Sequence, residues 1–96
     1  MDFVLSFEAR TDLLDIDTYI AEKNPEAASR LVDEFFEAFA KLARRPELGH
    51  VRRDLTTLPV RFWPLRSFLI IYDPGARPLM IVRVLSGYRD IVDLLG

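Results

Sequence analysis

Residues 79–90 have the sequence Leu-Met-Ile-Val-Arg-Val-Leu-Ser-Gly-Tyr-Arg-Asp. The first eight are almost all aliphatic, a pattern that is typical of a strand buried on both faces and too short for a membrane span. The strand is expected to stop at Ser86-Gly87, so that Tyr88, Arg89 and Asp90 follow together at its end. We expect the rest of the chain to cover and position this strand.

Alternation along this strand separates its side chains into two faces. The predicted faces are Met80, Val82 and Val84 on one side, and Leu79, Ile81, Arg83 and Leu85 on the other. Arg83 is thus a guanidinium among aliphatic side chains. Burying it is costly unless it is paired with an acid or reaches water at an edge of the sheet.

The 96 residues are enough for one domain, which we expect to span residues 1–96, but not for two. No apolar run approaches the length of a transmembrane helix, and the N-terminus does not resemble a signal peptide. The chain has no cysteine, which fits a reducing compartment. These features predict a small cytoplasmic protein without a membrane partner.

The net charge of −2 hides a strong asymmetry between the two halves. Residues 1–43 hold four Lys/Arg against ten Asp/Glu, giving −6, and residues 44–96 hold nine arginines against five acids, giving +4. A block this basic suggests contact with an anionic partner. The alternative is that the two halves neutralise each other within one fold.

The first part of the chain has the pattern of a short strand followed by a helix. Phe3, Leu5 and Phe7 alternate with Asp2, Val4 and Ser6, and Ser6 suits the N-cap of the helix. The apolar stripe of this helix consists of Ala9, Leu13, Ile16 and Ile20. Its expected outer face consists of Asp12, Asp15, Asp17 and Glu22.

A second helix is predicted from about Pro25 to Arg44. Asn24 is its expected cap, Pro25 suits the first helical position, and Pro46 follows its end. Its apolar side consists of Ala28, Leu31, Val32, Phe35, Phe39 and Leu42, widened by Phe36. So short a break between two amphipathic helices predicts an antiparallel hairpin.

Two further strands precede the opening stretch. Residues 58–63 alternate with period two and are expected to end at Pro64, and residues 66–73 form the next strand before a loop at 73–78. Residues 91–95 fit either a helical turn or a strand. The predicted fold is therefore α+β, in the order β-α-α-β-β-β, with the helix hairpin covering one face of a small antiparallel sheet.

The sequence offers few groups for metal or nucleophilic chemistry. His50 is the only histidine and lies in a predicted turn, and the four glycines do not form a phosphate-binding loop. We therefore expect no metal, no cofactor and no catalytic residue.

Arginines dominate the second half, and Trp63 and Tyr88 lie among them. The cationic positions on or beside the predicted strands are Arg52, Arg53, Arg61, Arg66, Arg83 and Arg89. Arginines interleaved with aromatic rings suit phosphates and bases. Pairing of the same arginines with neighbouring acids is the alternative.

In order and spacing, the chain resembles the RelE/ParE family of type II toxins over nearly its whole length. The matching segments are residues 12–16, 19–21, 24–28, 42–46, Gly49, 51–55, 61–63, 69–72 and 81–91. This resemblance implies the fold predicted above, a helix hairpin on an antiparallel sheet.

Two positions bear on the branch of the family. RelE-like members are ribosome-dependent mRNA endonucleases whose third strand carries a catalytic arginine, and Leu69 stands at that position here. ParE-like members usually have histidine before the glycine at position 87, where this chain has Ser86. Arg83 and the segment Gly87-Tyr88-Arg89-Asp90 still resemble the ParE-like branch.

The resemblance implies a ParE-like toxin that binds DNA gyrase, is not itself an enzyme, and is neutralised by a cognate antitoxin in a hetero-oligomeric complex. DNA would be contacted only through the antitoxin. The residues expected to bind the target are Arg61, Trp63, Arg83, Tyr88 and Arg89. The alternatives are a RelE-like mRNA endonuclease and a non-toxic homologue that only binds antitoxin.

Overall fold

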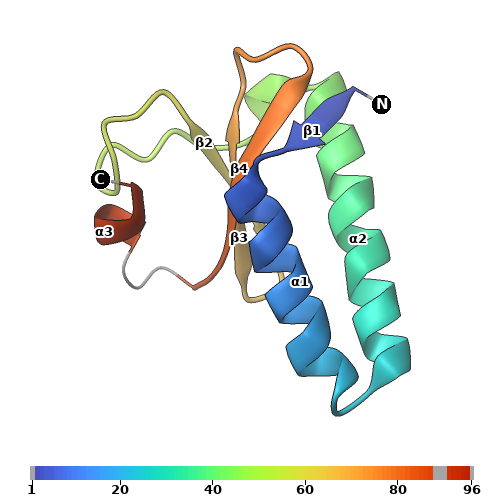
Figure 1. Ribbon diagram of the computed structural model, residues 1–96. Coiled ribbons are helices and arrows are strands. Elements are labelled where there is room, and N and C mark those ends of the chain that lie inside the picture. Colours follow the sequence, from blue (N-terminus) through green and yellow to red (C-terminus); the bar gives the residue numbers. More distant parts are fainter. Residues whose placement is uncertain (1, 88–90, 96) are drawn as a thin grey trace.

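The computed structural model describes residues 2–87 and 91–95. Its elements are β1 (Phe3–Leu5), α1 (Phe7–Ala21), α2 (Pro25–Arg44), the 3₁₀ turn η1 (Pro46–Leu48), β2 (Arg61–Leu65), β3 (Phe68–Asp73), β4 (Leu79–Ser86) and α3 (Ile91–Leu95). The helices α1 and α2 form an antiparallel hairpin on one side of the sheet, and α3 lies on the other (Figure 1). The predicted α+β fold and element order are confirmed, and the tail is helical.

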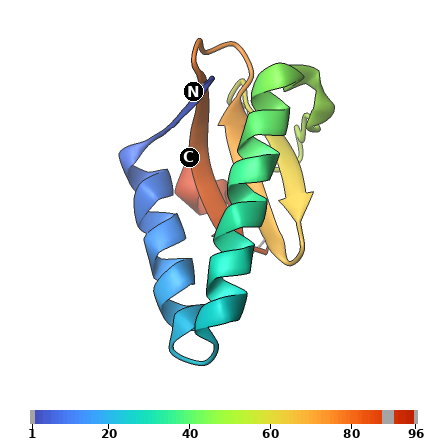
Figure 2. The same cartoon turned by 90° about the vertical axis from the view of Figure 1, so that its right-hand side faces the viewer.

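The four strands form one sheet in the order β1-β4-β3-β2. The last three strands make the predicted antiparallel meander. The first strand joins it in parallel, with Val4 opposite Met80, so the sheet is mixed. Figure 2 shows β1 at one outer edge of this sheet, beside β4.

Both helix starts follow the predicted capping chemistry. The Ser6 hydroxyl accepts the Ala9 N–H at 3.0 Å, and the Asn24 side-chain oxygen accepts the Ala27 N–H at 3.0 Å. Each bond satisfies one of the first-turn donors that a helix leaves unpaired. The first strand is shorter than its pattern suggested, because Phe7 begins α1 and is exposed.

Two apolar clusters fill the two sides of the sheet. The larger one joins the hairpin to the sheet and centres on Phe35, Phe39, Leu42, Ile70, Tyr72 and Ile81. The smaller one, on the opposite face, consists of Val60, Phe62, Leu69, Ile71, Leu85 and Ile91, with Leu55, Val82 and Leu95 at its margin. The segment before β2 and helix α3 thus cover the face that the hairpin leaves open.

The predicted first residues of β2 and β3 were wrong. Residues 58–60 precede β2, which begins at Arg61 and continues through Pro64. Pro64 is tolerated because β2 is an edge strand, where a missing N–H leaves no ladder bond unmade. Arg66 lies in the turn between β2 and β3 with a positive φ of 54°, so β3 begins only at Phe68.

The predicted faces of β4 were wrong beyond Ile81. Tyr72 is paired with Ile81 and Ile71 with Arg83, so Val82 is an extra residue in β4. Such a bulge reverses the alternation that follows it. Val84 therefore joins Ile81 in the cluster beneath the helices, and Val82 packs with Leu85 on the opposite face.

Candidate functional site

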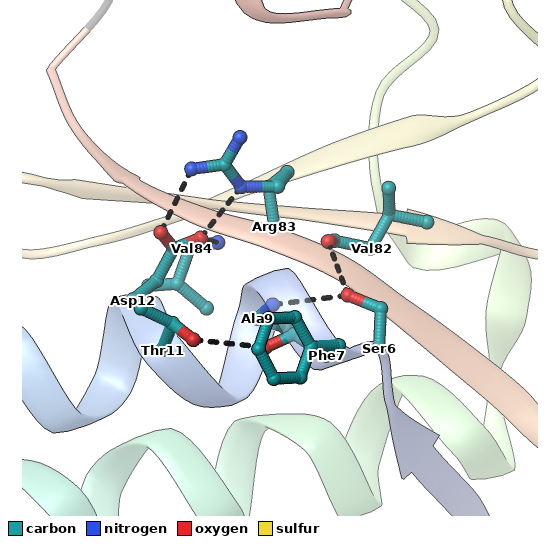
Figure 3. A network of polar contacts seen from close by, with 8 residues as sticks. All are labelled: Ser6, Phe7, Ala9, Thr11, Asp12, Val82, Arg83 and Val84. Atoms are coloured by element: carbon teal, nitrogen blue, oxygen red, sulfur yellow. Dashed lines mark hydrogen bonds and ion pairs between the residues drawn. The ribbon is translucent and has the colours of Figure 1, made fainter.

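Arg83 is held by Asp12 of α1. Its Nε and Nη2 donate to the two carboxylate oxygens of Asp12, each at 2.8 Å (Figure 3). The side chains are only 20% and 12% exposed, and the hydrogen bond to Asp12 raises the pKa of Arg83. This two-bonded geometry is the strongest form of arginine–carboxylate pairing. The pairing alternative predicted for a buried Arg83 is confirmed.

The same contact secures the bulged edge of β4. β1 pairs with β4 only as far as Ile81, and within residues 2–87 and 91–95 no strand lies beside the same edge of β4 beyond that residue. The Ser6 hydroxyl donates to the Val82 carbonyl at 2.7 Å, and the Val84 N–H donates to Asp12 at 2.9 Å (Figure 3). Side chains from the start of α1 thus replace a strand along this edge.

Asp12 is the important residue that the sequence analysis misplaced, because it does not lie on the outer face of α1. It is three residues after Ala9 and four before Ile16, which puts it on the buried stripe of the helix. The sequence could have indicated this ion pair, because Asp12 places a carboxylate on the buried stripe of α1 and Arg83 is an arginine in a buried strand.

Arg61 supports the segment that precedes β2. Its Nη1 donates to the Gly49 carbonyl at 2.8 Å and makes a longer bond to the Glu47 carbonyl at 3.4 Å. The Tyr72 hydroxyl holds the same segment, since it donates to the Pro46 carbonyl at 2.6 Å and accepts the Gly49 N–H at 2.8 Å. Burial raises the pKa of Tyr72. Tyr72 was absent from the predicted site, and it acts as an internal link.

Trp63 forms part of a groove between α2 and β2. The side chain is partly buried, with the Lys41 Nζ 5.1 Å from the centre of its indole ring and the His50 ring stacked at 6.5 Å. The groove has a volume of about 650 Å³, and Lys41, Arg44, Glu37 and Pro64 also line it. Among the described members of the predicted site, Trp63 is thus the one that lines this open groove.

Arg66 also lines this groove. It donates to both carboxylate oxygens of Glu34 on α2, at 2.7 and 2.6 Å, and this contact lowers the pKa of Glu34. Both groups are solvated, so the pair contributes little to stability. Its effect is to fix the position of the β2–β3 turn beside α2.

The described members of the predicted site do not form one cluster. Arg61 and Trp63 belong to β2, and β3 separates them from β4, which carries Arg83. Tyr88 and Arg89 lie outside the described residues. The residues that flank them are anchored, because the Gly87 N–H donates to the Ser67 carbonyl at 3.1 Å and Ile91 is buried in the smaller cluster.

The described part of the chain has neither a metal-binding cluster nor a membrane-spanning helix. Within residues 2–87 and 91–95, no group of three or more His, Cys, Asp or Glu side chains could hold a metal ion. None of the helices in this part of the chain is long and apolar enough to cross a membrane.

Comparisons with known proteins place this architecture in a family. A comparison with curated protein sequences gave no significant match. Among solved structures, the fold is similar to one described as the chromosomal ParDE TA system from P. aeruginosa, with a TM-score of 0.73 and 22% identity over 91% of this chain and 96% of that one. The family model for the ParE toxin of the type II toxin–antitoxin system parDE matches residues 3–91. The chain therefore belongs to the ParE toxin family of type II toxin–antitoxin systems.

Proposed function

We propose that this ParE-family protein inhibits DNA gyrase by binding it, and that a cognate antitoxin neutralises it in a hetero-oligomeric complex. Family membership supports the toxin role and implies the antitoxin partner. The choice of a protein target over RNA cleavage rests on the surroundings of Leu69.

Leu69 occupies the strand position at which RelE-like endonucleases carry a catalytic arginine. Its side chain is 3% exposed and lies in the smaller apolar cluster with Ile71, Leu85 and Ile91. Cleavage of RNA needs a cation that stabilises the developing phosphorane charge, and a group that takes the 2′-hydroxyl proton. A buried aliphatic side chain supplies neither, which favours binding over catalysis.

The charge of the protein also favours a protein target. The pI is about 5.3, whereas binding within ribosomal RNA is strengthened by neutralising many phosphates. Three arginines of the basic half are already engaged by the chain itself: Arg61 by backbone carbonyls, Arg66 by Glu34 and Arg83 by Asp12. Their capacity to neutralise phosphates is correspondingly reduced.

The proposed gyrase-binding residues remain Arg61, Trp63, Arg83, Tyr88 and Arg89. The ion pair with Asp12 uses Nε and Nη2 of Arg83 and leaves Nη1 directed away from the carboxylate (Figure 3). A target carbonyl or carboxylate could therefore be bound by Nη1 without breaking the pair. Trp63 offers a partly exposed ring in the groove beside α2.

The test combines gyrase and translation measurements. Purified toxin is added to DNA gyrase with relaxed plasmid, and amino-acid and thymidine incorporation are followed after induction in cells without antitoxin. We expect that the toxin inhibits supercoiling, that translation continues and that replication fails. Added antitoxin should restore the supercoiling activity of gyrase. Rapid loss of translation with cleaved mRNA would instead identify the endonuclease, and normal growth would identify a non-toxic antitoxin-binding protein.

A further inference from the structure

The groove between α2 and β2 combines an apolar lining with room for part of a partner (Figure 2). Its volume of about 650 Å³ falls within the range of roughly 300–1,000 Å³ that is usual for binding clefts. The apolar lining consists of Ala38, Ala40, Trp63, Pro64 and Leu65. Because the two alanines of α2 have short side chains, the space beside the Trp63 ring stays open.

Two cations of α2 line this groove without an acidic partner. Each of the four ion pairs between described residues involves other side chains than Lys41 and Arg44. Both cations are exposed, and the Lys41 Nζ lies 5.1 Å from the centre of the Trp63 ring. Their charge is therefore available to a partner that contacts the indole.

The acids that line the groove do not cancel this charge. Glu34 is already engaged, because Arg66 donates to both of its carboxylate oxygens. Among the described residues that line the groove, Glu37 is the acid without an ion pair, and it faces two cations, which leaves a surplus of one positive charge. An apolar lining beside surplus positive charge suits a segment that presents carboxylates next to an apolar side chain.

The edge strand beside the groove does not accept another strand. Along β2, Phe62 exchanges two backbone hydrogen bonds with His50, each 2.8 Å long, and Pro64 has no N–H. A bridging residue and a proline both block the addition of a strand at a sheet edge. A partner in the groove is therefore held by side chains, and the exposed tryptophan edge and the two cations are the groups that can hold it.

We propose that the α2–β2 groove is part of the gyrase-binding surface and receives an acidic segment of gyrase, with an apolar side chain against Trp63 and carboxylates at Lys41 and Arg44. This proposal rests on the proposed inhibition of gyrase. It adds two residues of α2 to the target-binding residues, whereas the sequence placed all of them in the basic half. It also assigns Glu37 an effect, since its carboxylate repels the acidic segment and weakens the contact.

A matched pair of charge reversals tests the contact, with the affinity of the purified toxin for intact DNA gyrase as the measurement. Lys41 and Lys23 are both exposed, both lie near the C-terminal end of a helix, and both contact an aromatic ring, which for Lys23 is Tyr19 at 3.9 Å. We expect Lys41→Glu to raise the Kd at least about tenfold and Lys23→Glu to change it by less than about twofold. Melting temperatures of the two variants verify that both remain folded.

The outcomes separate this proposal from the proposed function. If the parent binds gyrase and the two variants bind it equally well, the proposal is overturned and the inhibition of gyrase stands. If the parent does not bind gyrase, both are overturned. Sedimentation of the toxin alone tests a second copy as the occupant: self-association that Lys41→Glu abolishes would assign the groove to that copy and overturn the proposal.

Neutralising one acid tests the charge of the partner. We expect Glu37→Gln to lower the Kd for gyrase about threefold, because it removes the repelling carboxylate from the groove. Asp33→Asn changes the net charge of the toxin equally, at an exposed position of α2 outside this groove, and should leave the Kd unchanged. An unchanged or higher Kd for Glu37→Gln would overturn the acidic character of the bound segment.

Discussion

The carboxylate of Asp12 accepts both Nε and Nη2 of Arg83, which is 71 residues away in the sequence, and also the N–H of Val84. One side chain of α1 thus neutralises a partly buried cation and completes the backbone bonding of the bulged β4 edge. The pair shows how a sheet strand can carry an arginine among aliphatic residues at a tolerable cost.

Replacing Asp12 should be among the most damaging single changes in the hairpin. Asp12→Ala leaves the Arg83 guanidinium unpaired, and we expect a loss of about 3 kcal/mol in the free energy of unfolding. Urea denaturation measures this loss. Asp15→Ala, at an exposed position on the same helix, is the matched control and should change stability by less than about 0.5 kcal/mol. Equal effects of the two variants would contradict the role of the pair.

Gly49 lies against the buried ring of Tyr72. A methyl group at this glycine would come within 2.6 Å of the Tyr72 Cε1, although the backbone at φ −70° suits any residue. We expect Gly49→Ala to lower the free energy of unfolding by about 2 kcal/mol through overpacking. In Gly75→Ala the nearest heavy atom is the Asp73 Oδ1 at 3.5 Å, so this control should retain the parent stability.

The Tyr72 hydroxyl predicts a dependence of stability on alkaline pH. Burial raises its pKa in the folded protein, so the folded state holds this proton more tightly than the unfolded state does. The contribution of the protonated hydroxyl to the free energy of unfolding is complete below the pKa of about 10 that tyrosine has in the unfolded state. This contribution is lost as the pH rises through the pKa of Tyr72 in the folded state. Urea midpoints between pH 8 and 11 should fall more steeply for the parent than for Tyr72→Phe. Parallel curves would show that Tyr72 does not cause the decline.

Toxicity and thermal stability together should test the roles of Arg83 and Arg89. If both contact the target, Arg89→Ala and Arg83→Ala each relieve growth inhibition, and Arg83→Ala also lowers the melting temperature, because it leaves Asp12 without its partner. Growth assays and thermal denaturation of the same variants make the comparison. A folded double variant that remained fully toxic would show that neither arginine belongs to the target-binding surface.

The sequence predicted those features that depend on local chemistry. Asn24 and Pro25 marked the start of α2 correctly, because a side-chain cap and a fixed φ are properties of adjacent residues. The element order followed from periodicity. The limits of β2 were misjudged because alternation continues through residues 58–60, where the chain has not yet reached β3.

The features that sequence alone missed depend on distant contacts. No local pattern marks Val82 as a bulge, so the faces of β4 were reversed beyond it. The sequence indicated that Arg83 needs an acidic partner, but it did not show which Asp or Glu this is. Identifying Asp12 requires knowing how α1 packs on the sheet. The sequence showed only that Leu69 stands where the RelE-like members have an arginine. The structure adds that its side chain packs in the smaller apolar cluster.

The position of β1 in the sheet has a consequence for the order of folding. Its partner is β4, so β1 can pair only after β4 is available. The hydrogen bond between Ser6 and Val82 joins residues that are 76 positions apart in the sequence. The α1–α2 hairpin needs only neighbouring segments and can form early, whereas non-local pairing forms slowly. A partly synthesised chain therefore has its helices but not its complete sheet. The protein gains its finished surface only after β4 has been made.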